Sequence, residues 1–177
     1  MSLKNLSAKI KIPKLLKINL DNKRVKNIYN NFEKSLMIDQ KFAVAVSGGP
    51  DSLSLAFLAK IYSIKNKISS KFFIVDHKLR PESTDEANFI KKILKKFHID
   101  SKILTWEGIK PIKNIQSMSR KNRYSLIFNQ CDKLNINNIL LGHHQDDLFE
   151  NFFIRLLRGS GLKGLISLDK KVKIGNK

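Results

Sequence analysis

One stretch decides the fold of this chain, and it reads Lys41-Phe42-Ala43-Val44-Ala45-Val46-Ser47-Gly48-Gly49-Pro50-Asp51-Ser52. The short apolar run before Ser47 predicts a strand that is buried on both faces. The residues from Pro50 to about Ile64 are apolar nearly all round and predict a buried helix, whose first turn tolerates proline. The two glycines therefore lie in a tight turn that leads from a strand into a helix.

This turn has the features of a phosphate-binding loop. Glycines let the backbone approach a ligand closely, and the N–H groups at a helix N-terminus favour an anion. Asp51 places a negative charge where the phosphate is expected, which is reasonable if Mg²⁺ lies between them. The string matches neither GxxxxGK(S/T) nor GxGxxG. An ordinary tight turn is the alternative, but the full string favours a phosphate site formed by Ser47, Gly48, Gly49, Pro50, Asp51 and Ser52.

Outside this stretch, strands and helices alternate along the chain. Further strands are predicted at 71–75, 101–106 and 138–142, and further helices at 82–97, 116–134 and 146–157. An amphipathic helix at about 22–37 follows an irregular N-terminal start. Alternating elements with short connections predict parallel strands joined by right-handed crossovers, which gives a doubly wound α/β sheet. In such sheets a ligand lies beyond the carboxyl ends of the strands, where the loop after Val46 also falls.

The composition bounds the class of protein. With 177 residues and an apolar fraction of 42%, the chain is long enough for one substantial core. No apolar run reaches the roughly 18 to 20 residues that a membrane span needs. The single cysteine, Cys131, cannot form an internal disulfide or a CxxC pair, and a reducing cytoplasm fits it. We expect a cytoplasmic protein with no membrane partner, in which Cys131 is a small buried residue.

The chain is strongly basic, with a formal charge of +19. Such a charge favours polyanionic partners, and nucleic acid comes first. The alternative is that an AT-rich coding sequence produced the excess of Lys, Asn and Ile. The charge alone does not decide between a binding surface for nucleic acid and such a codon bias. Only six of the 34 basic residues are arginines, and five of those six lie in or beside the motifs described next.

Further motifs follow the loop in chain order. They are Val75-Asp-His-Lys-Leu-Arg-Pro-Glu-Ser83, Ser119-Arg-Lys-Asn-Arg-Tyr124, Leu141-Gly-His-His-Gln-Asp-Asp147 with Glu150, and Arg155-Leu-Leu-Arg-Gly-Ser-Gly-Leu162. The loop resembles that of the N-type ATP pyrophosphatases, the PP-loop superfamily. In their order and spacing, the motifs together resemble the tRNA(Ile)-lysidine synthases from about Phe42 to Leu168. The resemblance implies a PP-loop ATPase fold, similar to the adenine nucleotide alpha-hydrolases.

The resemblance also implies an activity, that of an ATP-dependent ligase. ATP adenylates C2 of the wobble cytidine in the CAU anticodon of an isoleucine tRNA. The amine of free L-lysine then displaces AMP and gives lysidine. ATP and Mg²⁺ are the implied cofactors, and the tRNA and L-lysine are the implied partners.

Acidic residues after the last predicted strand are candidates for the chemistry. One helical face carries His143, Asp147 and Glu150, and carboxylates there can hold Mg²⁺ or receive an ammonium group. The alternatives are an acidic N-terminal cap, or a zinc site, whose usual ligand spacing this motif does not match. The family pattern implies Asp51 and Asp147 as metal ligands and Glu150 as a contact for the lysine ammonium. The predicted catalytic residues are Asp51, His143, Asp147 and Glu150.

Three residues outside the loop are predicted to bind the nucleotide. Asp76 ends a strand near the place where a nucleoside would lie. Arg120 and Arg123 share a helical face three residues apart, and arginine suits phosphates of ATP or RNA. The alternative for these two arginines is an ordinary surface pair.

We expect three segments in the chain. They are a basic N-terminal arm with an amphipathic helix at 1–38, a PP-loop ATP-binding catalytic domain at 39–168 and the truncated start of a further segment at 169–177. Members of the family generally continue with smaller domains that help to grip the tRNA, so these C-terminal domains are expected to be absent here.

Two other functions are considered. A tRNA thiolation enzyme has the same loop, but several such enzymes use paired cysteines and this chain has one cysteine. A non-catalytic nucleotide-binding or RNA-binding remnant is the second, although the intact acids Asp51, Asp147 and Glu150 argue against decay. A homodimer is kept as one arrangement to test.

Overall fold

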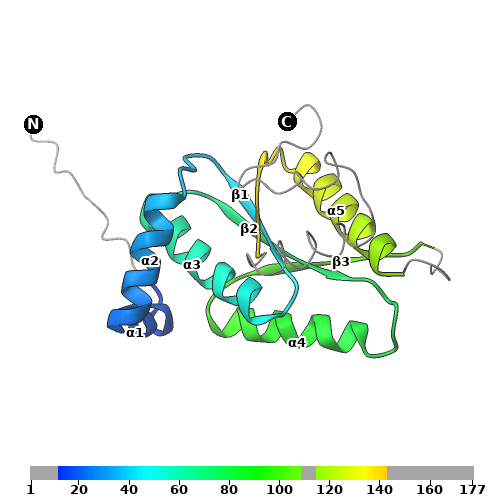
Figure 1. Ribbon diagram of the computed structural model, residues 1–177, viewed down its shortest axis with the longest axis horizontal. Coiled ribbons are helices and arrows are strands. Elements are labelled where there is room, and N and C mark those ends of the chain that lie inside the picture. Colours follow the sequence, from blue (N-terminus) through cyan, green and yellow to red (C-terminus); the bar gives the residue numbers. More distant parts are fainter. Residues whose placement is uncertain (1–11, 109–114, 143–177) are drawn as a thin grey trace, which may run out of the picture. The chain divides into compact units, whose positions relative to one another are not determined.

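The computed structural model describes residues 12–108 and 115–142, which form a parallel sheet flanked by helices (Figure 1). The strands are β1 Phe42–Val46, β2 Ser70–Asp76, β3 Ser101–Thr105 and β4 Asn138–Leu141. The helices are α1 Lys14–Asp21, α2 Lys23–Ser35, α3 Pro50–Asn66, α4 Ser83–Lys96 and α5 Ile115–Lys133. The predicted strands are all present, and so are the helices predicted within the described residues. The helix predicted at 146–157 lies outside these residues.

The sheet has the strand order β3-β2-β1-β4, and its three pairings are all parallel. β1 lies inside the sheet, with Val44 paired to Phe72 of β2 on one side and to Leu140 of β4 on the other. The prediction of a parallel α/β sheet is therefore confirmed.

Alternate residues of the strands pack into two hydrophobic cores, one on each face of the sheet. On one face, Phe42 and Val44 pack with residues of α2, α3 and α4. On the other face, Ala43 packs with Ile127 and Cys131 of α5. Figure 1 shows α5 on the opposite side of the strands from α3 and α4, which is the doubly wound arrangement. The alternation follows from the two-residue period of a strand, and the prediction that Cys131 is buried is confirmed.

The strand order has a switch point between β1 and β4. From β1 the chain runs through α3 to β2 and through α4 to β3, and α5 then returns it to the other side of β1. Ala45 and Leu141 are the last pair in the β1–β4 ladder. Open α/β sheets bind ligands beyond the carboxyl ends of the strands at such a point. The loop that begins at Ser47 leaves β1 there.

The N-terminal part differs from the prediction of an irregular start. α1 forms there and is followed directly by α2, whose N-cap Asn22 accepts hydrogen bonds from the N–H groups of Arg24 and Val25. Leu16 of α1 is fully buried in the same core as Tyr29 of α2. A helix of this length is unstable alone, so tertiary burial of Leu16 explains why the local sequence did not reveal it.

The chain divides into two compact units, Met1–Leu141 and Gly142–Lys177. Apart from Gly142, the second unit lies outside the described residues, and so does the predicted boundary at 168. In the described part of the chain, none of the helices has the length and apolar character that a membrane crossing requires.

Candidate phosphate-binding site

Ser52 organises the loop after β1. Its side chain is 3% exposed, and its Oγ accepts hydrogen bonds from the backbone N–H groups of Ser47 at 3.2 Å and Gly48 at 3.1 Å. The same hydroxyl donates to the carbonyl of Gly49 at 2.9 Å, and the Ser47 hydroxyl lies 3.2 Å from it. One buried hydroxyl thus closes the loop on itself and fixes the direction in which α3 begins.

Gly48 has a backbone conformation that other residues rarely adopt. Its φ is 91°, in the left-handed region. A Cβ atom on Gly48 would lie 2.4 Å from Cδ1 and 2.8 Å from Cγ1 of Ile90, which belongs to α4. Glycine at this position is therefore favoured chiefly by the backbone, and an added Cβ would also displace the Ile90 side chain. Gly49 is different, because its φ is −69° and the nearest atom to an added Cβ is 4.0 Å away.

The N-terminus of α3 lacks a side-chain cap. Gly49 is the N-cap, Pro50 has no N–H, and the N–H of Leu53 donates to the Gly49 carbonyl at 3.1 Å. The N–H groups of Asp51 and Ser52 are therefore available at the positive end of the helix dipole. Asp51 itself is exposed in this first turn. Backbone donors beside an exposed carboxylate suit a phosphate whose charge is shared with a cation.

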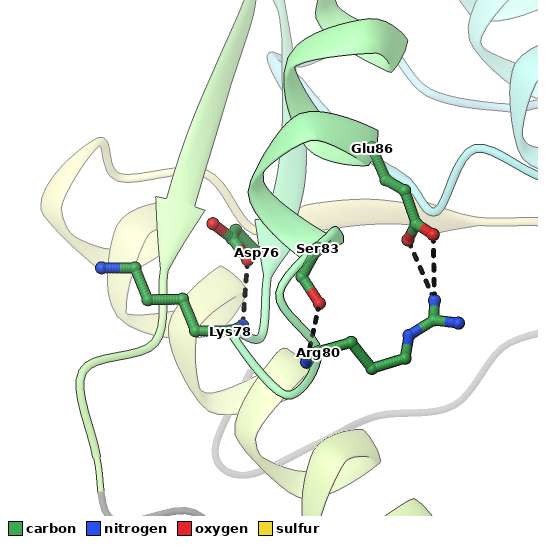
Figure 2. Close-up of polar contacts among 5 residues, drawn as sticks. All are labelled: Asp76, Lys78, Arg80, Ser83 and Glu86. Carbon is green, nitrogen blue, oxygen red and sulfur yellow. Dashed lines mark hydrogen bonds and ion pairs between the residues drawn. The ribbon is translucent and has the colours of Figure 1, made fainter.

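Asp76 holds the turn that follows β2 (Figure 2). Its carboxylate is 2% exposed, and Oδ1 accepts a hydrogen bond from the N–H of Lys78 at 2.9 Å. Oδ2 accepts one from the hydroxyl of Thr84 at 2.7 Å. The backbone carbonyl of Asp76 accepts from the N–H of Trp106 after β3 at 2.8 Å. Asp76 therefore ties together the ends of two strands and the start of α4, and both of its carboxylate oxygens already accept a hydrogen bond.

Arg80 and Glu86 close the same turn on its outer side. Nη2 of Arg80 lies 3.1 Å and 3.0 Å from the two carboxylate oxygens of Glu86, and the Arg80 N–H donates to the Ser83 hydroxyl at 3.2 Å (Figure 2). Both charged side chains are more than half exposed. Such an exposed pair contributes at most about 1 kcal/mol to stability, so it orients the turn more than it stabilises the fold.

His77 and Arg123 bring two of the predicted motifs together. Nε of Arg123 in α5 donates to Nε2 of His77, which follows β2, over 3.4 Å. An accepting Nε2 places the ring proton on Nδ1, which is buried and has no partner among the described residues. Burial, the guanidinium of Arg123 and, in the opposite sense, Asp76 act on the pKa of His77, with the net effect of lowering it from 6.5. His77 is therefore neutral at pH 7.

The two predicted arginines have different surroundings. Arg123 is half-buried against His77, whereas Arg120 is exposed, with its guanidinium 5.8 Å from the centre of the Tyr124 ring. Between them, Nδ2 of Asn122 is buried and has no hydrogen-bond partner among the described residues. Asn122 lies within a quoted motif, but sequence reasoning assigned a role only to its charged neighbours.

Other residues of the site had no local signal in the sequence. Thr84 and Ile90 act through contacts with Asp76 and Gly48, from which they are separated by 8 and 42 positions. Three predicted catalytic residues, His143, Asp147 and Glu150, lie outside the described residues.

The sequence matches the PP-loop domain family over residues 19–177. The chain belongs to the PP-loop family. This match includes the Ser47–Ser52 loop, β1 to β4 and the residues that follow β4, and it implies use of ATP.

Curated relatives of this PP-loop chain are named tRNA(Ile)-lysidine synthase. The protein from Orientia tsutsugamushi (strain Boryong) is 46% identical over 127 residues, which are 72% of this chain and 29% of that protein. The protein from Wolbachia pipientis wMel is 42% identical over 144 residues, 80% of this chain and 33% of that protein. The protein from Rickettsia prowazekii (strain Madrid E) is 40% identical over 143 residues, 81% of this chain and 32% of that protein. These matches confirm the resemblance seen in the motifs, and the chain spans 29–33% of the length of these relatives.

A solved structure shares the PP-loop fold. It is the U34-tRNA thiolase NcsA from Methanococcus maripaludis with its 4Fe-4S cluster, at a TM-score of 0.72 and 22% identity. The likeness covers 85% of this chain and 55% of that one. At this identity it shows the fold alone, and it confirms the predicted PP-loop α/β architecture.

The metal ligands are only partly within the described residues. Within 12–108 and 115–142, no group of three or more His, Cys, Asp or Glu side chains is placed to hold a metal ion. Of the two predicted Mg²⁺ ligands, Asp51 lies in the PP-loop and Asp147 lies outside the described residues. The assignment of Mg²⁺ to this pair stays a prediction.

Proposed function

We propose that this PP-loop chain catalyses the ligation of L-lysine to C2 of the wobble cytidine in the CAU anticodon of isoleucine tRNA. ATP is cleaved to AMP and pyrophosphate in the reaction, and the product nucleoside is lysidine. The names of the curated relatives support this choice of substrates. A cytoplasmic location follows from the tRNA substrate and is part of the proposal.

The observation that carries the proposal is the place of the PP-loop in the sheet. The loop leaves β1 beside the β1–β4 switch point, and the N–H groups of Asp51 and Ser52 are available there. The buried Ser52 hydroxyl fixes the loop that leads into these donors, so they are preorganised and need no rearrangement when negative charge develops on the departing pyrophosphate. In the sequence, His143 comes two residues after the end of β4, the strand that pairs with β1.

The chemistry divides into two displacements. The base oxygen at C2 of the cytidine attacks the α-phosphorus of ATP, and the bond to pyrophosphate breaks. The lysine amine then attacks C2, and AMP leaves with that oxygen. The protein residues bind the leaving pyrophosphate, and positioning with electrostatic stabilisation accounts for most of such catalysis. Asp51 and Asp147 would hold Mg²⁺, which would supply positive charge to offset that of the phosphates.

Residues outside the loop complete the site. Arg123, held by His77, is proposed to contact phosphate, and Arg120 is free to contact either ATP or RNA. Asp76 is proposed to act near the nucleoside through the turn it organises. His143 and Glu150 are proposed to receive the lysine ammonium or to accept its proton.

The buried position of Cys131 argues against the alternative function, tRNA thiolation. Cys131 is the single cysteine of the chain, it is 1% exposed, and it packs in the core between α5 and the sheet. A thiol in that position has no access to a nucleotide at the carboxyl ends of the strands, so lysine ligation is the better-supported function.

The test incubates the full chain with ATP, Mg²⁺, labelled L-lysine and an unmodified transcript of isoleucine tRNA. Label in the tRNA together with release of AMP supports the proposal. Asp51→Asn is expected to abolish incorporation. Asp85→Asn is a matched control, because Asp85 is also an exposed acid in the first turn of a helix.

Two results contradict parts of the proposal. ATP binding without transfer of label indicates a non-catalytic nucleotide-binding protein. Full activity of Asp51→Asn removes the metal–phosphate role from that carboxylate. Whether the protein forms a homodimer is checked in the same preparation by its mass in solution.

A further inference from the structure

A cavity lies far from the PP-loop, among α1, α2 and the last turn of α3. Its volume is about 380 Å³, and it is lined by Ile12, Lys17, Leu20, Asp21, Lys26, Tyr29, Asn30 and Lys65. Figure 1 shows α1 and α2 beside α3 at the end away from β3. The PP-loop family match begins at residue 19, so Ile12 and Lys17 precede it. The cavity is therefore built partly from residues outside the family match.

Three lysines from three helices converge on this cavity. Lys17 comes from α1, Lys26 from α2 and Lys65 from α3, and Asp21 is the one acid in the lining. Neither Lys17 nor Lys26 forms an ion pair with a carboxylate of a described residue. Like charges gathered around a hollow repel one another, and a bound anion offsets that repulsion.

The lysines of α4 provide a contrast within the same chain. Lys91, Lys92, Lys95 and Lys96 are exposed along one helix, and none of them lines this cavity. Such a row is an ordinary solvated face. Convergence from separate helices distinguishes the cavity lysines from this row and argues for a ligand.

The back of the cavity is closed and neutral. Nζ of Lys65 lies 4.1 Å from the centre of the Tyr29 ring and 4.0 Å from Oε2 of Glu33. The Tyr29 ring is fully buried, and its hydroxyl donates to Glu33 at 2.7 Å. Burial first, and then the hydrogen bond to Glu33, raise the pKa of Tyr29 well above its usual range, so the phenol stays neutral. Because its face is covered, Tyr29 offers no platform on which a base could stack.

We propose that this cavity is a phosphate-binding site that takes the sugar–phosphate backbone of RNA. With Lys65 paired to Glu33, Lys17 and Lys26 still outnumber Asp21 by one, which leaves positive charge for a phosphate group, and the cavity volume falls in the range of pockets that hold small organic ligands. Lysine ammonium groups bind phosphate as point charges and read no base, so the recognition is independent of sequence. The choice of RNA over free phosphate rests on the proposed function; the anion site does not.

The position of the cavity suits a long substrate. Lys65 follows Asp51 by 14 residues of α3, and a helix rises 1.5 Å per residue, so about 20 Å separates them along the helix. At a rise of about 3.4 Å per nucleotide in a helical strand, that is roughly six nucleotides. One RNA can therefore reach both places, with the cavity contacting backbone well away from the reacting cytidine.

The test measures binding of a fluorescently labelled, unmodified isoleucine tRNA transcript by anisotropy over a series of salt concentrations. The variant is Lys17→Gln with Lys26→Gln, and both side chains are exposed, so the fold is retained. The matched control is Lys92→Gln with Lys95→Gln on α4, which removes the same charge. The cavity variant is expected to bind about five to ten times more weakly and to lower the salt slope by about 0.9, which is one phosphate contact. The control is expected to change affinity less than about twofold.

Several outcomes overturn the proposal. Equal losses in both variants mean that net charge alone is responsible, and an unchanged cavity variant means that RNA does not bind there. If inorganic phosphate raises the melting temperature of the wild type but not of the cavity variant, while both bind RNA equally, the site takes a free anion and the RNA assignment is wrong. Binding needs neither ATP nor lysine. A weakened cavity variant therefore supports this inference even if no lysine is incorporated, in which case only the proposed function fails.

Discussion

Replacing Gly48 by alanine tests the geometry of the PP-loop. Two costs are expected from the structure. The φ of 91° is unfavourable for any residue with a Cβ, by about 1–2 kcal/mol. The new Cβ would also lie 2.4 Å from Cδ1 of Ile90, but that atom ends a flexible side chain. Ile90 can rotate away for about 0.5–1.5 kcal/mol, so the backbone is the larger of the two costs. Together they lower the free energy of unfolding by about 1.5–3.5 kcal/mol.

Urea unfolding followed by circular dichroism measures this difference, with two comparison variants. Gly49→Ala is the matched control, because φ is −69° there and the added Cβ has open space. The entropy that alanine removes from the unfolded chain then offsets the small loss at an N-cap, and stability is expected to stay within about 0.5 kcal/mol of the wild type. Ile90→Val with Gly48→Ala removes Cδ1, and it should recover no more than the steric part, about 1 kcal/mol.

Three results would refute this reasoning about the loop. Gly48→Ala could prove as stable as the wild type, which would mean that the backbone is not held at positive φ. Gly49→Ala could cost as much as Gly48→Ala, so that the two glycines would not differ as the structure has them. Recovery of the full loss in the double variant with Ile90→Val would make the contact with α4, rather than the backbone, the dominant cost.

Three further predictions follow from the same region. Ser52→Ala leaves the N–H groups of Ser47 and Gly48 without their acceptor, so the free energy of unfolding in urea should fall by about 1–3 kcal/mol. The control Ser54→Ala, at an exposed position of α3, should change it little, and equal effects of the two variants would contradict the role of the buried hydroxyl. Thr84→Val keeps the shape of the side chain but removes the donor to the Asp76 carboxylate, and a loss of about 1–3 kcal/mol is expected; no change in thermal unfolding would show that the bond does not stabilise the turn. Burial and the nearby guanidinium lower the pKa of His77 from 6.5, so the unfolded chain binds more protons than the folded one between the lowered pKa and 6.5. The stability that neutral His77 contributes is therefore complete above pH 6.5 and is lost as the pH falls below it. The free energy of unfolding of His77→Gln should depend less on pH across that window than that of the wild type. If the two proteins show the same pH dependence, the role given to His77 is wrong.

Much of the site was predictable because its signals are local. The string from Ser47 to Ser52 has its glycines, proline and serines next to one another, and the strand before it and the helix after it show their own periods. Asp76 could be placed at a strand end for the same reason. The role of its carboxylate could not, because the partner Thr84 is a common residue eight positions away in a different element.

Contacts between elements were not predictable in this way. His77 and Arg123 are 46 positions apart, and each was quoted in a separate motif without any sign that they meet. α1 was missed because its stability depends on burying Leu16 against other helices rather than on its own sequence. In the sequence, the lysines of the cavity among α1, α2 and α3 were part of a general excess of basic residues, and only the packing of three helices brought them together.

The sequence by itself determined the PP-loop, the alternation of strands and helices and the family, since each of these depends on residues close together in the chain. Only the tertiary structure decided the strand order β3-β2-β1-β4, the packing of Ile90 over Gly48 and the pairing of His77 with Arg123. The physical reason is that crossovers join distant segments. Which side chains then meet depends on how whole helices pack on the sheet, and no short stretch of sequence contains that information.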